Sequence, residues 1–309
     1  MTKIAYAGLG NMGLAIAPHL SKWAKENGAQ FAVWNRTQAK YDELRPNVAE
    51  DTQCATDLKD LADSDIVFLS VLNDAATQSV VQTLTDAGFK GIFVDQSSVQ
   101  PNTSSANCET AAKTGAKYLA APVFGRPDAA AAAQLIQVVA GDQEAIKSVK
   151  PLLDTSARIV LNLGTEVYKA ANTLKLMGNA MILGVIELLG ETFALGEATG
   201  IDSHVFQQFI EAFFPTPSFK AYSKKIEGGN FDGKGGFRLE GGLKDANNIL
   251  GVGASLGKPV PMPTIEIAKK NMERAAELGG KDMDWSSLSA VLRENAGLPP
   301  FKVEQKKSS

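Results

Sequence analysis

The segment KIAYAGLGNMG, Lys3 to Gly13, decides the fold of this 309-residue chain. An apolar run leads directly into glycines with GxGxxG spacing, the pattern that joins the first strand to the first helix of dinucleotide-binding folds. The first glycine permits a tight turn, the second lets a pyrophosphate approach the backbone, and the third lets helix and strand pack closely. An ordinary glycine turn is the alternative, but here a strand pattern precedes the motif and a helix pattern follows it. The cofactor-binding residues expected in this segment are Gly8, Leu9, Gly10, Asn11, Met12 and Gly13.

Short β-rich runs alternate with helical patterns from Ile4 to about Leu163. After the first strand these runs are FAVWNRT, DIVFLSVL, GIFVDQSS, KYLAAPV and LIQVVAG. Because helices separate the strands, the pattern predicts a parallel, doubly wound sheet, which is an α/β, Rossmann-like fold class. The alanine run from Ala129 to Ala133 is strongly helix-forming and predicts a tightly packed helix.

The pattern changes after Gly164. From Thr165 to about Thr199 there is no proline and apolar residues recur with helical spacing, which predicts one helix of roughly 35 residues. The sequence beyond it is also mostly helical. We therefore expect a Rossmann-like NADP-binding domain over 1–164, an all-α substrate and dimerisation domain over 165–302 that begins with this interdomain helix, and a flexible tail over 303–309.

The composition is that of a soluble globular protein. Apolar residues at 44%, charged residues at 21% and a formal charge of −3 are ordinary values without the basic excess that nucleic acid requires. Cys54 and Cys108 lack CxxC spacing, and His19 and His204 stand apart, so we expect neither a disulfide framework nor a metal site. No signal peptide precedes the first strand, and no stretch reaches the roughly 20 apolar residues that span a bilayer. We expect a cytoplasmic protein without membrane or nucleic-acid partners.

The end of the second strand indicates which cofactor is preferred. An NAD-binding protein usually offers an acidic residue to the ribose hydroxyls here, about 20 residues after the glycines. This chain has Asn35, Arg36 and Thr37 instead. A guanidinium pairs with a 2′-phosphate, and the flanking amide and hydroxyl groups add hydrogen bonds. A solvated arginine at a strand end is the alternative, but the missing acid and the added base both favour NADP.

Four segments in this order resemble the β-hydroxyacid dehydrogenases, the family of 3-hydroxyisobutyrate dehydrogenase and of glyoxylate and succinic semialdehyde reductases. They are GLGNMG, VLND, DQSSVQP and APVFGRPDAAAAAQL, and the likeness extends over nearly the whole chain. VLND stands where the family has a cofactor loop, which implies contacts from Val71, Leu72 and Asn73. DQSSVQP matches the family segment D-x-S-[ST]-x-x-P, which implies that Ser97 lies near both the substrate and the nicotinamide.

The fourth segment departs from the substrate loop that it resembles. Phe124 stands where the family has serine, Arg126 where it has a second glycine, and Ala133 where it has another, whereas Gly125 is retained. Loss of the serine hydroxyl removes a donor to a substrate carboxylate and makes the pocket more apolar. Arg126 either replaces that interaction with a charge-assisted one or points to solvent. The resemblance implies a small carboxylated substrate that contacts Phe124, Gly125 and Arg126.

Two lysines at the start of the long helix compete for the family's catalytic position, which lies four residues before an asparagine. Lys175 has Asn179 at that spacing and also aligns Glu191 and Gly200 with the family without a gap, whereas Lys169 requires a shift of six residues. At 100° per residue, Asn172, Lys175 and Asn179 fall within about 60° of one another and of Tyr168. We therefore assign Lys175 and Asn179 as catalytic and substrate-binding residues.

Lys175 suits a carbonyl reduction by NADPH. A lysine whose pKa is depressed in a partly desolvated cleft can deliver a proton to the carbonyl oxygen, and Asn179 can donate a hydrogen bond to the same oxygen. Lys244 and Asp245 match a family K-D segment whose lysine reaches toward the cofactor, so Lys244 is a further expected cofactor ligand. The segment from Asp282 to Ser287 resembles a family signature that we interpret as structural.

The sequence therefore predicts an NADPH-dependent reductase of small semialdehydes or keto acids that works in reverse as a β-hydroxyacid dehydrogenase. Two alternatives stay open. An imine reductase is favoured by the apolar Phe124 and disfavoured by the retained Lys175. A non-catalytic NADP-binding interaction protein is disfavoured by Lys175 and by the absence of a basic arm. The family resemblance further implies a homodimer formed by the helical domains.

Overall fold

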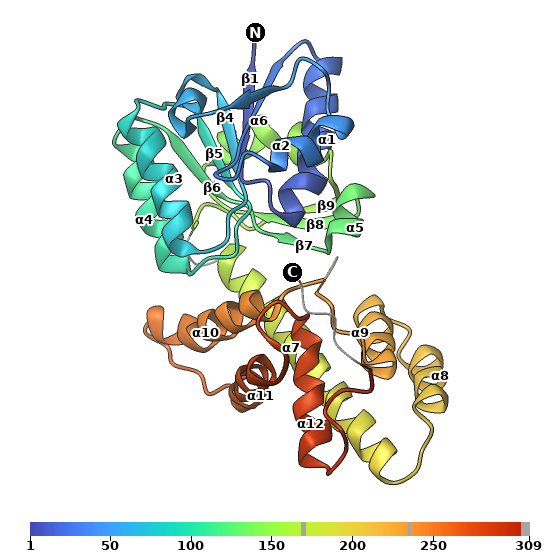
Figure 1. Cartoon of the computed structure of the whole chain (residues 1–309). Helices are drawn as coiled ribbons and strands as arrows, with labels where there is room; N and C mark the ends of the chain where they lie inside the picture. The colour runs from blue at the N-terminus through green and yellow to red at the C-terminus, as the bar shows by residue number, and fades with distance from the viewer. Residues whose placement is uncertain (168–170, 234–235, 304–309) are drawn as a thin grey trace. The chain divides into compact units, whose positions relative to one another are not determined.

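The computed structural model describes residues 1–167, 171–233 and 236–303 (Figure 1). It divides into two compact units, Met1–Lys175 and Leu176–Ser309, which we call the first and second units. The division lies within the long helix that the sequence predicted after Gly164. The physical reason is packing, because Ala171 is fully buried in the core of the first unit and Leu174 packs against that core.

The first unit is built on a six-stranded parallel sheet with the order β3-β2-β1-β4-β5-β6, which confirms the Rossmann-like topology (Figure 1). Its strands are β1 (Lys3–Ala7), β2 (Gln30–Trp34), β3 (Gln53–Ala55), β4 (Ile66–Leu69), β5 (Ile92–Asp95) and β6 (Lys117–Ala120).

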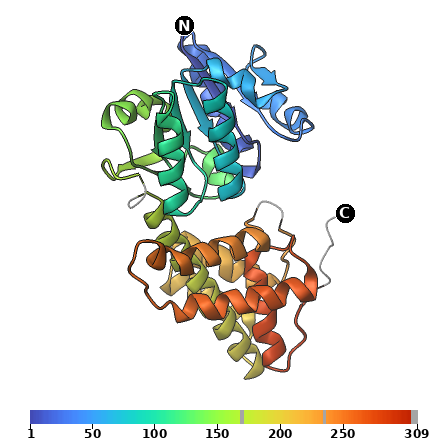
Figure 2. The ribbon, with the colours of Figure 1, turned by 90° about the vertical axis from the view of Figure 1, so that its left-hand side faces the viewer.

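Helices cover both faces of this sheet, as two views at right angles show (Figure 2). Alternate residues of β1 point to opposite faces. Ile4 and Tyr6 pack in one core with α1 and α6, and Ala5 and Ala7 pack in another with α3 and α4. These helices are α1 (Asn11–Glu26), α3 (Asp74–Asp86), α4 (Pro101–Ala112) and α6 (Gln143–Leu153), and the shorter elements are α2 (Lys40–Leu44), η1 (Arg45–Asn47) and η2 (Leu58–Asp63).

A second, three-stranded sheet corrects the expectation of one parallel sheet. It consists of β7 (Val123–Phe124), β8 (Leu135–Val139) and β9 (Ala157–Asn162), with β7 antiparallel to β8 and β8 parallel to β9. The run LIQVVAG therefore does not extend the main sheet. The strand β9 was not expected, because its side chains are mostly exposed and its sequence lacks the apolar run of a buried strand.

The alanine run forms a shorter helix than expected. The helix α5 (Pro127–Ala131) ends before Ala133, which has a φ of 54°. Among the described residues, Ala133 is the one non-glycine residue with a positive φ. The high helix propensity of alanine is overridden here because the chain must turn back into β8.

The second unit is all-α, as the sequence predicted. Its elements are α7 (Ala171–Ala198, whose first residues belong to the first unit), α8 (Ser203–Phe213), α9 (Pro217–Gly228), α10 (Leu239–Ser255), α11 (Pro263–Gly279), η3 (Trp285–Leu288) and α12 (Ser289–Asn295). The helix expected from Thr165 is shorter at its start, because residues 165–167 are not helical. At 28 residues α7 is about 42 Å long. It supplies the centre of the second core through Leu176, Leu183, Ile186 and Phe193.

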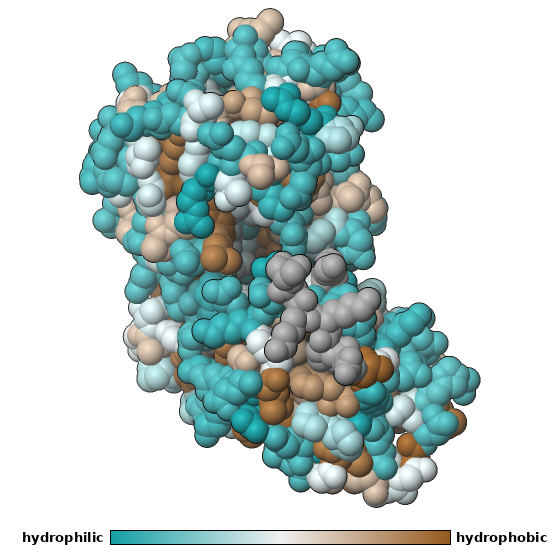
Figure 3. Space-filling view, in the orientation of Figure 1, coloured by the Kyte–Doolittle hydropathy of each residue, from teal (hydrophilic) through white to brown (hydrophobic). Residues whose placement is uncertain are grey.

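By length and composition alone, α7 could span a membrane, so the expectation that no stretch is apolar enough was wrong. Its apolar residues have another role. Leu183 and Ile186 are completely buried among the helices of the second unit. On the face that Figure 3 shows, hydrophilic residues predominate and apolar ones form small groups.

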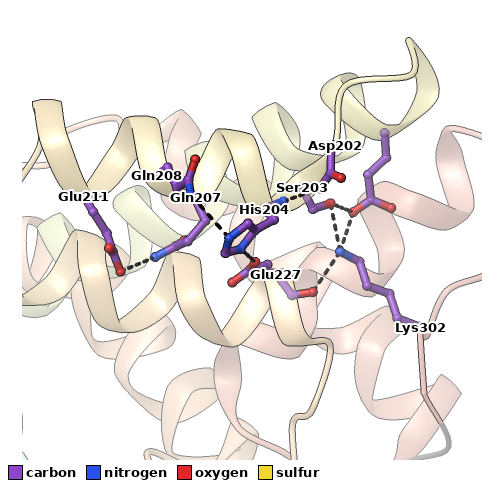
Figure 4. A network of polar contacts seen from close by, with 9 residues as sticks. Asp202, Ser203, His204, Gln207, Gln208, Glu211, Glu227 and Lys302 are labelled. Carbon is purple, nitrogen blue, oxygen red and sulfur yellow. Dashed lines mark hydrogen bonds and ion pairs between the residues drawn. The ribbon is translucent and has the colours of Figure 1, made fainter.

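Polar contacts near the C-terminal segment hold three parts of the second unit together (Figure 4). The ammonium of Lys302 lies 2.6 Å from Glu197 Oε1 and donates to Ser203 Oγ at 3.1 Å and to the carbonyl oxygen of Glu227 at 3.0 Å. Glu197 also pairs with Arg293. The chain after α12 is therefore fastened to the end of α7, the start of α8 and the end of α9.

Candidate active site

The loops that carry the predicted cofactor residues follow the carboxyl ends of parallel strands. β1, β4 and β5 run side by side and end at Ala7, Leu69 and Asp95. Their loops therefore emerge at one edge of the sheet, the edge at which doubly wound folds bind ligands. The sequence predicted the parallel sheet that produces this arrangement.

The glycine-rich loop has the geometry that its spacing predicts. Gly8 has a φ of +103°, and a Cβ there would lie 2.2 Å from the carbonyl oxygen of Ser70. A Cβ on Gly13 would lie 2.0 Å from the carbonyl oxygen of Gly8. A Cβ on Gly10, the residue before α1, would meet no atom within 4 Å. No described residue fills the space at Gly10, so the loop fits the close approach of a pyrophosphate to the start of α1. Asn11 and Met12 form the first turn of that helix.

The side chain of Asn35 forms hydrogen bonds that hold this loop. Its Oδ1 accepts a hydrogen bond from the amide of Leu9 at 2.9 Å, and its Nδ2 donates to the carbonyl oxygen of Thr37 at 2.8 Å. The side chain of Asn35 therefore joins the glycine-rich loop to the turn after β2, and its expected contact with a 2′-phosphate stays a prediction. Arg36 and Thr37 are exposed in that turn, and Arg36 forms no ion pair with the described residues. An exposed guanidinium beside this loop fits a 2′-phosphate.

The second cofactor loop follows β4. Asn73 caps α3, because its side chain accepts from the amide of Ala76 at 3.0 Å. Leu72 is 62% exposed, and the amide of Val71 donates to Ser97 Oγ at 3.0 Å. The hydroxyl of Ser97 therefore connects this loop with the segment after β5.

Ser97 is itself held by Asp95. The amide of Ser97 donates to Asp95 Oδ1 at 2.8 Å, and Tyr118 donates to Asp95 Oδ2 at 2.6 Å. Burial raises the pKa of the Asp95 carboxyl to about 6, although hydrogen bonds from Tyr118 and Ser97 oppose that rise. Asp95 and Ser97 are both buried, so these hydrogen bonds fix the loop that carries Ser97 to the end of β5.

The residues of the substrate loop lie at β7 and the start of α5. Phe124 ends β7 and is partly buried, and Gly125 has a φ of +138°, a conformation that L-residues rarely adopt. Arg126 precedes α5, with its Nε 4.0 Å from Asp128 Oδ1 and its side chain 39% exposed. Arg126 thus lies beside Asp128 of its own loop, and its contact with a substrate carboxylate stays a prediction.

Lys175 lies against the substrate loop within the first unit. Its ammonium is 4.6 Å from the centroid of the Phe124 ring, a distance at which a cation is attracted to an aromatic face. Asn172, one turn earlier on α7, is buried and contacts Ser104 and Val99. The competing residue Lys169, like Tyr168, lies outside the described residues.

Asn179 and Lys244 meet in the second unit through Asp245. Asn179 Nδ2 donates to Asp245 Oδ2 at 2.6 Å, and Lys244 Nζ lies 3.0 Å from Asp245 Oδ1. Asp245 is 1% exposed, and a carboxylate buried to this extent depends on such partners. The expected contact of Lys244 with the cofactor stays a prediction, and the hydrogen bond between Asn179 and Asp245 was not expected from the K-D segment.

Sequence reasoning missed several residues that support the site. Tyr118 gave no signal because a tyrosine on a strand is ordinarily a core residue, and Ser104 is one of several small polar residues on α4. Asp245 was matched to the family K-D segment, but without a role of its own. Over residues 1–167, 171–233 and 236–303, no group of three or more histidine, cysteine, aspartate or glutamate residues is arranged to hold a metal.

Known protein families and curated proteins resemble this chain over most of its length. A family model for the NAD binding domain of 6-phosphogluconate dehydrogenase matches residues 3–164, and a model for the NAD-binding of NADP-dependent 3-hydroxyisobutyrate dehydrogenase matches residues 170–292. The uncharacterised oxidoreductase YfjR of Bacillus subtilis is 34% identical over 297 residues, covering 94% of this chain and 100% of that protein. The 2-(hydroxymethyl)glutarate dehydrogenase of Eubacterium barkeri is 27% identical, over 94% of this chain and 96% of its own.

Solved structures show the same fold. A 3-hydroxyisobutyrate dehydrogenase from Salmonella typhimurium superposes with a TM-score of 0.80 at 18% identity, covering 94% of this chain and 100% of the other. A reductive aminase from Aspergillus terreus, in complex with NADPH and ethyl levulinate, superposes with a TM-score of 0.60 at 23% identity, covering 95% and 100%.

Proposed function

Because this chain belongs to the β-hydroxyacid dehydrogenase family of NAD(P)-dependent oxidoreductases, we propose that it uses NADPH to reduce a small carboxylated aldehyde or keto acid, and that it oxidises the corresponding hydroxyacid in reverse. The observation that carries this proposal is the position of Lys175, whose ammonium lies 4.6 Å from the ring of Phe124 in the substrate loop. Both residues belong to the unit that holds the glycine-rich loop.

Lys175 is the proton donor of the proposed reaction. The loop from Gly8 to Gly13, together with Arg36, would hold NADPH, which supplies a hydride to the carbonyl carbon when bound. Lys175 Nζ gives a proton to the carbonyl oxygen in the reduction and takes it back in the oxidation. Asn179, one helical turn after Lys175 and oriented by Asp245, donates a hydrogen bond to that oxygen.

The role of Arg36 is tested by substituting it and measuring activity with NADPH and with NADH. We expect Arg36→Ala to lower kcat/KM for NADPH roughly 10- to 100-fold, because the guanidinium pairs with the 2′-phosphate, and to leave kcat/KM for NADH unchanged. The matched control is Arg45→Ala, which removes an exposed arginine from η1. Equal activity of the wild type with both cofactors would contradict the NADPH assignment.

A substrate panel tests the reaction itself. NADPH consumption is measured with glyoxylate, succinic semialdehyde and methylmalonate semialdehyde, for the wild type and for Lys175→Ala. We expect turnover of at least one of these aldehydes by the wild type. If NADPH bound tightly and none of a broad set of carbonyl compounds reacted, a cofactor-binding role without catalysis would replace this proposal.

Imine reduction is a second candidate, and one observation favours it. The ring of Phe124 lies beside Lys175 at the position where the family has a serine hydroxyl, so this side of the loop offers an apolar surface in place of a carboxylate donor. The reductive aminase with this fold supports the same candidate, although only at the level of the fold. Turnover of a cyclic imine without turnover of the carboxylated aldehydes would favour it.

A further inference from the structure

Asn172 joins the start of α7 to two other elements of the first unit. Its Nδ2 donates to the carbonyl oxygen of Val99 at 3.3 Å, and its Oδ1 accepts from Ser104 Oγ at 3.0 Å. Asn172, Ser104 and Val99 are each exposed by 1% or less. Buried hydrogen bonds of this kind fix geometry, because breaking one leaves a polar group without a partner in a place that water does not reach.

The partners of Asn172 lie close to Ser97 in the chain. Val99 is two residues after Ser97, and Ser104 lies on α4, the helix that this segment leads into. On the N-terminal side, the amide of Ser97 donates a hydrogen bond to Asp95 Oδ1. The segment from Asp95 to Val99 is therefore fastened both to the end of β5 and to the first turn of α7.

A third group of contacts stiffens this arrangement. Tyr118 gives its hydroxyl hydrogen to Asp95, and Ser104 gives its own to Asn172, so the 3.5 Å between the two hydroxyl oxygens is a packing contact. Asn107 Nδ2 lies 3.4 Å from the hydroxyl oxygen of Tyr118, to which it donates. Little freedom remains for Asn172 to change its partners.

Because Asn172 and Lys175 share the start of α7, the hydrogen bonds of Asn172 also fix the position of Lys175. Residues three apart on a helix lie on the same side, about 60° apart, and the helix backbone between them is rigid. A rotation or shift of the first turn of α7 would therefore move the ammonium of Lys175 relative to Ser97 and Phe124. Misplacement of a proton donor by about 1 Å can lower a rate 100-fold.

We propose that Asn172 and Ser104 are positioning residues, which fix the first turn of α7 relative to the Ser97 segment and so hold the Lys175 ammonium at the ring of Phe124. This role rests on the proposed function, because it requires Lys175 to be the proton donor. Neither residue touches the reacting atoms in this account. Their effect passes through the start of α7.

A double-mutant cycle with Lys175 tests the proposal. Ser104→Ala removes one hydroxyl without a large change of volume, and we expect it to lower kcat roughly 10-fold while the KM for NADPH stays the same. In the Lys175→Ala background we expect Ser104→Ala to have no further effect on the residual kcat, because it acts only through Lys175. Asn172→Ala, which removes both bonds of the asparagine, should show the same dependence on Lys175 and serves if Ser104→Ala folds poorly.

Ser21→Ala is the matched control. Ser21 is also a buried serine of the first unit, but its hydroxyl binds the amide of Ala49 and contacts Thr52, far along the chain from α7. We expect this variant to lose stability and to keep its kcat. Equal loss of kcat from Ser104→Ala in both backgrounds, or no loss in either, would overturn the positioning role alone. Full turnover by Lys175→Ala would instead remove the proposed function, and the positioning role with it.

Discussion

Ala133 occupies a conformation that costs free energy for any residue with a Cβ. Its φ of 54° lies in the left-handed region, where an L-residue is strained by roughly 1–2 kcal/mol. We predict that Ala133→Gly raises the free energy of unfolding by up to about 1 kcal/mol, because relief of this strain exceeds the added entropy of the unfolded chain. The measurement is the urea midpoint. Ala131→Gly, in the last turn of α5, is the control and should not stabilise.

Gly10 and Gly13 should respond differently to the same substitution. Gly13→Ala places a Cβ 2.0 Å from a backbone oxygen, so we predict loss of thermal stability together with loss of cofactor affinity. Gly10→Ala meets no atom within 4 Å, so we predict an unchanged melting temperature and a weakened Kd for NADPH, because the added methyl group fills the approach of the pyrophosphate. Fluorescence titration measures the Kd. Unchanged affinity in Gly10→Ala would show that the cofactor does not approach this residue.

The sequence was informative about some single residues and silent about others. The GxGxxG spacing predicted the roles of Gly8 and Gly13, because backbone sterics alone require glycine at both positions. The sequence did not reveal that Asn35 holds Leu9 and Thr37, because a polar residue at a strand end looks the same whether it binds a ligand or its own loop.

The helix α7 carries a buried acidic residue, Glu187, which is 2% exposed. Burial raises the pKa of Glu187 to about 7, Glu191 adds to the rise, and a hydrogen bond from Asn271 opposes it. Because this pKa lies above its ordinary value of 4.5, the folded state binds the proton more tightly, and stability falls as the pH rises from about 4.5 through about 7.

Glu187→Gln should therefore stabilise the protein at high pH. We predict a gain of roughly 1–3 kcal/mol at pH 8 and little gain at pH 4, because glutamine can keep the bond to Asn271 without a charge. Urea unfolding at both pH values measures it. Glu109→Gln, on an exposed residue of α4, is the control and should be neutral at both. A gain that does not depend on pH would show that Glu187 does not titrate as described.

The elements were predicted best where local pattern and packing agree. The parallel strands and α7 follow from apolar periodicity, whereas β9 is exposed and the start of α7 is set by contacts distant in sequence. Asn172 was placed on a polar stripe with Lys175, but the stripe does not reveal that Asn172 turns to Val99 and Ser104. Tertiary hydrogen bonds of this kind leave no periodic signal.

For the whole molecule, we propose a homodimer formed through α7. This helix exposes four large apolar side chains within about 40° of one another on its surface. They are Met177 (58% exposed), Met181 (75%), Leu188 (51%) and Leu195 (65%). A second copy that presents the same stripe would bury both stripes by twofold symmetry.

Sedimentation velocity measures this assembly. We predict a dimer for the wild type and a monomer for Leu188→Glu, because the carboxylate would be buried without a partner. The control is Ile159→Glu, which places the same charge on an exposed residue of β9 in the first unit. A monomeric wild type would contradict the proposed dimer.

The two units also differ in how far their sequence predicts their function. The first unit carries motifs whose spacing is fixed by the cofactor that they fit, so its fold and ligand class follow from sequence. The second unit carries Asn179, Asp245 and Lys244, whose contacts are known only from the structure. The substrate is the least predictable property, because Phe124 and Arg126 depart from the family at the loop that would select it.

The most direct test of the central claim is kcat for NADPH-dependent reduction of the fastest aldehyde of the panel, compared between the wild type and Lys175→Ala at saturating NADPH. Loss of a general acid typically lowers a rate 10²- to 10⁴-fold, and we predict a fall in that range with an unchanged Kd for NADPH. A kcat within twofold of the wild type would contradict the assignment of Lys175 as the proton donor.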